Sequence, residues 1–150
     1  MIIRRFKKED SQEVCKMVSR VFNEFVASEF TKRAVQKWLK EQVPEEQIKR
    51  AKTGDVYVAI SDNKIIGMIE GKENNRITRL FVDKKYHRRG IARKLVNKIE
   101  KLYKKRGAKK MLIRSSSYAT KFYEKMGYKK TRGLVKKDGM IYQPMKKILK

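Results

Sequence analysis

The sequence predicts an α/β domain with a mixed central β-sheet flanked by helices. In its first third, apolar residues recur at helical spacing, whereas from residue 55 onward they alternate as in strands. A strand, a helix and a second strand follow one another between residues 76 and 114, which is the pattern of a crossover between neighbouring strands. Because no linker or repeat divides the chain, we expect residues 1–150 to form one domain.

The N-terminal part predicts one strand and three helices. The apolar positions of residues 2–6 are typical of a short strand. Asp10 and Glu13 have the spacing of a capping box, which would begin the first helix. Helices are also predicted over residues 31–42 and 45–52.

The middle of the chain predicts a meander followed by a long helix. Strands over residues 55–61 and 64–71 have the pattern of a hairpin, and a strand over residues 76–82 extends it. A helix with one apolar stripe then begins near Ile91, and Gly107 ends it.

The last part predicts a strand, a short helix and a hairpin. The strand covers residues 109–115, the helix residues 118–127, and the hairpin residues 128–148 with its turn at residues 137–139. Because a helix joins the strands at 76–82 and 109–115, these two strands are expected to be parallel, with a right-handed connection.

Composition narrows the function classes. The chain has 41 Lys and Arg against 16 Asp and Glu, a net charge of +25, which attracts polyanions such as nucleic acid or a nucleotide. The basic residues are spread along the whole chain, so a compositional bias of the source organism is an equal alternative. One cysteine, Cys15, excludes an internal disulfide; it lies on the apolar side of the first helix, and no Cys/His cluster predicts a metal site. Without a long apolar run or a signal-peptide pattern, we expect a cytoplasmic protein that does not enter the membrane.

The stretch HRRGIA, residues 87–92, lies between a strand and a helix. The first amides of a helix have no internal partner and face a positive dipole end, so they can bind a phosphate. Gly90 and Ala92 would let a phosphate approach the backbone closely. Three arginines could add charge-assisted bonds: Arg88, Arg89 and Arg93. Taken alone, the stretch also fits a plain helix start among solvated charges.

Residues 77–128 resemble the core of the GNAT acyl-coenzyme A N-acyltransferases. The loop His87–Ala92 is similar to the family's [RQ]-x-x-G-x-[GA] loop, and Ala119–Tyr128, ATKFYEKMGY, is similar to its later A-x-x-F-Y-E-K-x-G-[FY] phrase. Two positions depart from the family pattern. His87 stands where Gln or Arg is common, and Ser116 stands where an Asn often contacts the cofactor.

The resemblance implies acetyl-CoA as acyl donor and no metal. The two parallel strands would splay into an acyl-CoA cleft, with the pyrophosphate on the amides of residues 88–93. The pantetheine arm would run along the end of the preceding strand. The resemblance thus implies these acetyl-CoA contacts: Leu80, Phe81, Val82, His87, Arg88, Arg89, Gly90, Ile91, Ala92, Arg93, Ser116 and Phe122.

The same resemblance implies direct attack of a primary amine on the thioester, with no Ser or Cys nucleophile. Tyr123 matches the family tyrosine that protonates the leaving thiolate. A backbone amide near Val82 could stabilise the oxyanion. Glu70 is the first candidate for a general base and Glu73 the second, and a chain of waters is an equal alternative. His87, the only histidine, lies in the phosphate loop and is not expected to act in catalysis.

The N-terminal helices carry aromatic residues in the region where this family builds its acceptor pocket. We expect these residues to belong to the core rather than to the pocket: Phe22, Phe25, Phe30 and Trp38.

The acceptor is expected to be a small molecule or a peptide, and the protein a monomer or homodimer. The basic field disfavours a polyamine and favours an amine on an anionic body. Two alternatives stay open: a nucleic-acid- or ribosome-associated binding module, and a GNAT-like protein that binds CoA without turnover.

Overall fold

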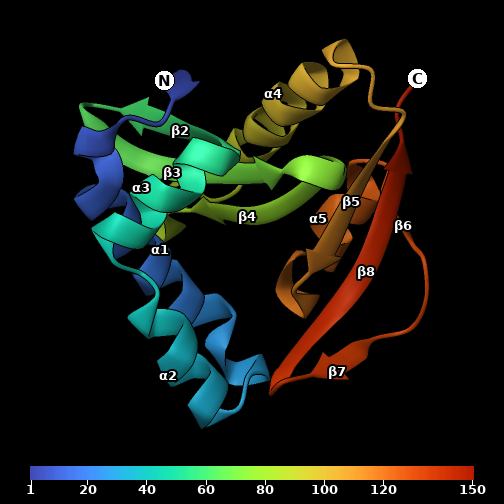
Figure 1. Cartoon of the computed structure of the whole chain (residues 1–150), viewed down its shortest axis with the longest axis horizontal. Helices are drawn as coiled ribbons and strands as arrows, with labels where there is room; N and C mark the ends of the chain where they lie inside the picture. Colours follow the sequence, from blue (N-terminus) through green and yellow to red (C-terminus); the bar gives the residue numbers. More distant parts are fainter.

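The computed structural model describes residues 1–150 and contains one eight-stranded sheet (Figure 1). The strand order is β1-β2-β3-β4-β5-β8-β6, and β7 pairs with β8. The strands are β1 (Ile2–Arg5), β2 (Asp55–Ser61), β3 (Lys64–Lys72), β4 (Arg76–Val82), β5 (Lys110–Ser115), β6 (Lys129–Lys130), β7 (Val135–Lys137) and β8 (Met140–Ile148). All pairings are antiparallel except that of β4 with β5, so the predicted mixed sheet is confirmed.

Helices cover both faces of this sheet. They are α1 (Ser11–Phe25), α2 (Lys32–Lys40), α3 (Pro44–Thr53), α4 (Ile91–Lys105) and α5 (Thr120–Lys125). One apolar core packs α4 and α5 against the sheet, and a second core packs α1 against the opposite face. Cys15 is buried in α1, as its position on the apolar side predicts. None of the helices is both long enough and apolar enough to cross a membrane.

The predicted capping box at the start of α1 is wrong. The Asp10 side chain makes no cap bond to the helix. It accepts hydrogen bonds from the Arg4 guanidinium at 2.8 and 3.0 Å and from the Lys7 amide at 2.7 Å. Glu13 accepts from the backbone N–H of Ile65 in β3 at 2.7 Å. Both carboxylates therefore tie α1 and the segment before it to neighbouring strands, which the spacing of two residues cannot reveal.

Replacing Asp10 by asparagine is expected to lower the free energy of unfolding by about 1–2 kcal/mol at neutral pH. Burial alone would raise the pKa of Asp10, but the Arg4 guanidinium and the Lys7 amide outweigh it and hold the pKa below its usual value. The contribution is therefore full above about pH 4 and disappears as the pH falls through the folded-state pKa. Denaturant unfolding of both proteins from pH 7 to pH 2 measures it.

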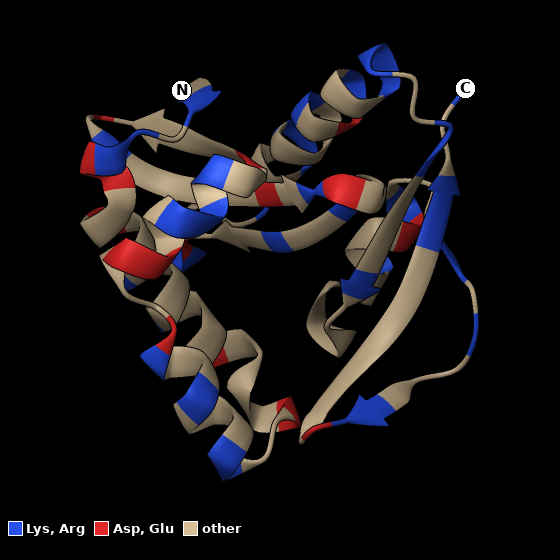
Figure 2. Ribbon diagram, in the orientation of Figure 1, with Lys and Arg blue, Asp and Glu red and all other residues tan.

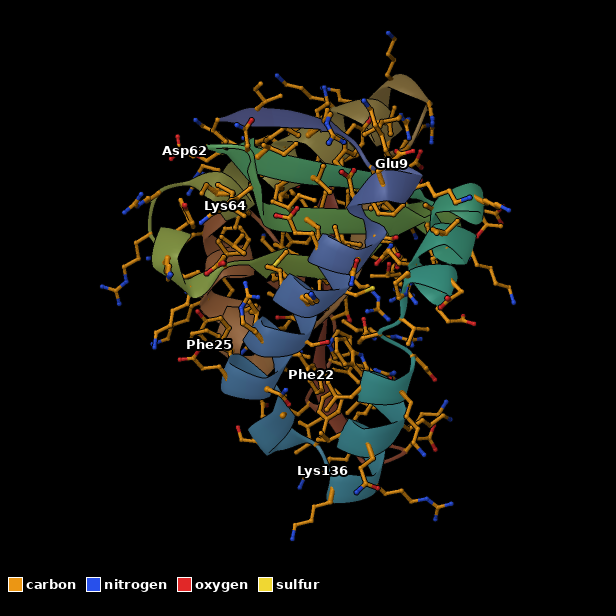
Figure 3. All side chains as sticks on the ribbon, turned by 90° about the vertical axis from the view of Figure 1, so that its left-hand side faces the viewer. Glu9, Phe22, Phe25, Asp62, Lys64 and Lys136 are labelled. Carbon is orange, nitrogen blue, oxygen red and sulfur yellow. The ribbon has the colours of Figure 1, made fainter.

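Asp62→Asn is the matched control for this experiment. Asp62 is exposed in the turn between β2 and β3 and makes no ion pair, and asparagine tolerates its positive φ of 50° (Figure 3). A loss of stability that is equal for the two variants, or one that persists at pH 2, would contradict the account of Asp10.

The basic residues are not gathered on one element. Lys and Arg colour parts of α2, α3 and α4, and also strands β5, β7 and β8 on the other side of the molecule (Figure 2). The net charge of +25 is therefore a property of most of the surface rather than of a single stripe.

Candidate active site

The cleft lies where β4 and β5 separate. Figure 1 shows how these two strands diverge. The two strands pair at only two positions, where Arg76 faces Leu112 and Ile77 faces Ile113. Beyond them, the edge of β4 that faces β5 has no strand partner, and a pocket of about 190 Å³ lies between the strands. The expected splay of the parallel strands is thus confirmed. The free N–H and C=O groups on this unpaired edge of β4 can form hydrogen bonds with an extended ligand, as a neighbouring strand would.

A β-bulge sits at the base of this opening. Glu70 of β3 faces Arg79 of β4, whereas the next residue, Gly71, faces Ile77, so Thr78 is one extra residue in β4. A bulge bends its strand and re-aims the side chains that follow. Ile77 lies in the core under α4, while the guanidinium of Arg79 lies over the ring of Trp38 in α2, on the opposite face.

The loop before α4 forms an anion site from its backbone. Gly90 caps the helix in the left-handed region, with φ 77°, and Arg88 is left-handed too, with φ 63°. The amides of residues 88–93 donate to no backbone carbonyl, and no side chain caps them. These free donors stand at the N-terminus of a 15-residue helix, where the dipole favours negative charge. The side chains of Ile91 and Ala92 pack on the core, so these two residues offer only their amides.

Three exposed arginines flank the loop: Arg88, Arg89 and Arg93. None of them forms an ion pair within the protein, and Arg89 lies over the ring of Tyr86 at 5.3 Å. Their guanidinium groups are therefore available to an anion on the free amides.

His87 joins the two walls of the cleft. Its Nε2 lies 2.7 Å from the carbonyl oxygen of Val82 at the end of β4, and its Nδ1 lies 3.2 Å from the hydroxyl of Tyr118 beyond β5. Since a carbonyl only accepts, Nε2 carries the proton and Nδ1 accepts from Tyr118. Phe25 of α1 stacks on Tyr118 at 4.7 Å. Both nitrogens of the histidine are thus engaged in holding the cleft together.

Tyr123 lines the cleft from α5 and is only 2% exposed. Its hydroxyl makes no hydrogen bond to a protein atom, whereas the neighbouring Tyr128 donates to Glu100 at 2.8 Å. Burial raises the pKa of Tyr123 far above its usual value of about 10, so the hydroxyl stays protonated. A neutral donor without a partner therefore faces the cleft.

The other residues assigned to acetyl-CoA divide into two groups. Leu80, Phe81 and Ser116 line the cleft, and the Ser116 hydroxyl accepts a 3.3 Å bond from the amide of Ala119, the start of the turn that leads into α5. The side chains of Val82 and Phe122 pack in or against the apolar core and are not part of the cleft lining.

Glu70 lies behind the cleft wall rather than in it. It is 1% exposed, accepts from Arg50 Nε at 3.1 Å and from Thr78 Oγ1 at 2.7 Å, and lies 3.7 Å from Arg79 Nε. Two guanidinium groups thus share one carboxylate. Glu73 is exposed in the turn before β4 and forms no ion pair. Neither carboxylate lines the cleft.

The aromatic residues of the N-terminal helices line the cleft more than the sequence predicts. Phe22 and Trp38 stack at 3.8 Å, and both line the pocket together with Phe30. Figure 3 shows Phe22 on the side of α1 that faces α2 and Phe25 on the other side. Phe22 does belong to the core, and Phe25 and Trp38 pack against it, as expected. The expectation is wrong in excluding Phe22, Phe30 and Trp38 from the pocket, which they also line.

Among the cleft residues that sequence reasoning missed are Arg79, Arg114 and Tyr142. Arg79 follows the bulge, and Tyr142 comes from the C-terminal hairpin. The one available signal was a charged residue in the predicted strand 76–82, in a stretch that is otherwise largely apolar beyond Thr78. No cluster of His, Cys, Asp or Glu in the chain could hold a metal ion.

Comparisons with known structures show the same fold in acetyltransferases. A GCN5-related N-acetyltransferase from Rhodopseudomonas palustris is similar with a TM-score of 0.87 at 21% identity, over 99% of this chain and 95% of that one. The PaiA N-acetyltransferase from Thermoplasma acidophilum, in complex with coenzyme A, has a TM-score of 0.82 at 23% identity, over 99% and 98%. An aminoglycoside 6′-N-acetyltransferase complexed with coenzyme A has a TM-score of 0.69 at 17% identity, over 99% and 97%.

A search of curated protein sequences finds no match. The family description of the acetyltransferase (GNAT) domain matches residues 26–149, which include the amide loop, Tyr123 and all of the cleft lining except Phe22. The chain is a member of the GNAT acetyltransferase family.

Proposed function

We propose that the protein transfers an acetyl group from acetyl-CoA directly to a primary amine. One observation carries the proposal: the unpaired edge of β4 runs from a bulge to a loop of free amides, with a protonated tyrosine facing the same cleft. In this proposal the pyrophosphate binds the amides of residues 88–93. The pantetheine arm pairs with the free edge at Leu80, Phe81 and Val82, and the acetyl group lies near Tyr123. The coenzyme A in two structurally similar enzymes supports this choice of donor.

The chemistry needs no covalent enzyme intermediate. The lone pair of the amine attacks the thioester carbon, and a C–N bond forms as the carbonyl electrons move to oxygen. A backbone amide on the free edge of β4, near Val82, stabilises this oxyanion. When the intermediate collapses, the C–S bond breaks and its electron pair stays on sulfur, which takes a proton from Tyr123. The proton released by nitrogen returns to the tyrosine through water, so amide and free thiol are the products.

Water is the proton carrier in this proposal because neither acidic candidate lines the cleft. Glu70, the first candidate base, is held between Arg50 and Arg79, and its proposed role is to position Arg79. Glu73 lies at the surface.

Acetyl-CoA is expected to raise the melting temperature of the protein. Ligand at about 100 times its Kd stabilises the native state by about 2.7 kcal/mol. In a chain of this length that is a shift of roughly 5–10 °C. Differential scanning fluorimetry with acetyl-CoA up to millimolar concentration measures the shift, and its absence would contradict the proposed donor.

Gly90→Val is expected to lower the affinity for acetyl-CoA by about tenfold or more. A β-branched residue strongly disfavours φ 77°, so valine would force the loop out of the shape that exposes the amides. Gly133→Val is the control, because Gly133 is exposed, has no atom within 4 Å of an added Cβ and does not have a left-handed φ. Isothermal titration compares both variants with the parent protein, and equal affinities would remove the loop from the binding site.

A further inference from the structure

The charged residues of the cleft all carry one sign. Two of its lining residues are charged, Arg79 and Arg114, and no Asp or Glu lines it. An acceptor amine is itself a cation before it reacts, so a cleft built for an amine alone, or for a polyamine, would place a carboxylate there. The lining instead predicts a negative group on the acceptor.

Arg79 is a largely buried cation whose hydrogen-bond and charge partners in the protein do not fully satisfy its guanidinium. Its side chain is 12% exposed. Nη1 donates to Gln42 at 2.8 Å, Nε lies 3.7 Å from Glu70, and Nη2 has no hydrogen-bond partner in the protein. Arg50 shares that carboxylate at 3.1 Å, so two guanidinium groups stand against one buried anion. The other carboxylate near Arg79, Glu41, is exposed, and solvent screens it.

The electrostatics leave one uncompensated positive charge at this wall of the cleft. Burial and the neighbouring Arg50 lower the pKa of Arg79 to about 10, which still leaves it charged at neutral pH. A desolvated charge is unfavourable unless a counter-charge or hydrogen bonds compensate it. A carboxylate bound in the cleft would supply both.

The β5 side of the cleft also carries an arginine without a carboxylate partner. Arg114 of β5 lies over the ring of Tyr142 at 5.3 Å, and no carboxylate pairs with it. A second cation, Arg76, lies near Arg114, and burial together with Arg114 lowers the pKa of Arg76. Tyr142 lines the same cleft as Phe22 and Trp38.

We propose that the acceptor is a small amino acid-like molecule, an amine that carries a carboxylate and an apolar or aromatic body. Arg79 binds the carboxylate, and Arg114 on the other wall adds to its attraction. The aromatic lining holds the body. This inference rests on the proposed acetyl transfer and specifies its substrate class.

A panel of matched amines tests the inference. Phenylalanine is compared with its amide and with phenethylamine, and leucine with its amide and with isoamylamine, all with acetyl-CoA and a free-thiol readout. The acid is expected to exceed both analogues at least about tenfold in kcat/KM, because a charge-assisted pair is lost in each analogue. The amides provide a stringent comparison. Their amino group is less basic than that of the acids, so a larger fraction of it is neutral and able to attack. If the carboxylate contributed nothing, the amides would therefore react faster than the acids.

Arginine variants then test which residues cause the preference for the acids over their amides. Arg114→Gln, at an exposed position that leaves no buried partner, is expected to reduce the acid-over-amide ratio several-fold. Arg33→Gln is the control, since it removes the same charge from an exposed site on α2 that makes no ion pair. Arg79→Gln is expected to abolish most of the preference, and its melting curve reports whether it is folded.

The outcomes separate this inference from the proposed function. Preference for the acids that falls in Arg114→Gln but not in Arg33→Gln supports it. Equal rates for acids and analogues, preference for the analogues, or no turnover on any acid while acetyl-CoA still raises the melting temperature would overturn it and leave the donor assignment intact. Failure of acetyl-CoA to bind would overturn the proposed function itself.

Discussion

Tyr123→Phe is expected to lower kcat about 100-fold and to change the affinity for acetyl-CoA by about twofold or less. The variant removes a buried hydroxyl that faces the cleft without a protein partner, so the thiolate would leave without a positioned proton donor. No hydrogen bond within the protein is lost, and the melting temperature should hardly change. Single-turnover measurement of free thiol and titration with acetyl-CoA separate the two parameters.

Tyr128→Phe is the matched control for this variant. Its ring lies 5.4 Å from that of Tyr123, but its hydroxyl donates to Glu100. Losing this bond should lower the free energy of unfolding by about 1–2 kcal/mol and leave kcat close to that of the parent. Equal kcat in the Tyr123→Phe variant and the parent protein would remove Tyr123 from the mechanism.

The raised pKa of Tyr123 has a kinetic consequence. Because burial keeps its hydroxyl protonated beyond pH 10, ionisation of this tyrosine does not limit kcat on the alkaline side of neutrality. A fall of kcat with an apparent pKa near 10 that disappears in Tyr123→Phe would contradict the burial of this group.

Glu70→Gln is expected to destabilise the protein by about 3 kcal/mol, equivalent to a fall in melting temperature of roughly 6–12 °C. The carboxylate is the shared counter-charge of Arg50 and Arg79, and both guanidinium groups are largely buried. An amide can still accept from Thr78 but cannot compensate two cations. Thermal and denaturant unfolding measure the loss.

Glu73→Gln is the control for this variant, because Glu73 is exposed and unpaired. The free energy of unfolding of the Glu73→Gln protein should differ from that of the parent by less than about 0.5 kcal/mol. Kinetics distinguish the positioning role of Glu70 from a general base. A positioning role predicts a raised KM for the acceptor with the acidic limb of the kcat profile unchanged. Loss of that limb in a folded Glu70→Gln protein would make Glu70 the base.

Much of this fold follows from periodicity in the sequence. The strand at 55–61 and the start of the helix at Ile91 agree with the structure residue for residue, because alternation and helical spacing report the burial pattern directly. Tyr123 and the amide loop could be predicted from two phrases and their order along the chain. Their placement around one cleft depends on β4 and β5 parting after two pairs, which no local pattern encodes.

The errors have a common physical origin in tertiary contacts. Asp10 and Glu13 have capping-box spacing, yet the Arg4 guanidinium and a distant strand amide bind their carboxylates. Phe22 and Trp38 have core spacing, but the sheet they would cover is open at the splay. Arg79 could not be recognised as a binding residue from the sequence. Its role depends on how few carboxylates lie near it in the folded protein, and the sequence alone does not show that.

Detection of an N-acetylated product is the most direct test of the central claim. The protein is incubated with acetyl-CoA carrying an isotopic label in the acetyl group and with phenylalanine, and the mixture is analysed by mass spectrometry. The account predicts labelled N-acetylphenylalanine and an equal amount of free CoA, both strongly reduced with Tyr123→Phe. Bound acetyl-CoA without acetylation of phenylalanine or any other amine would contradict it and would identify a CoA-binding protein without turnover.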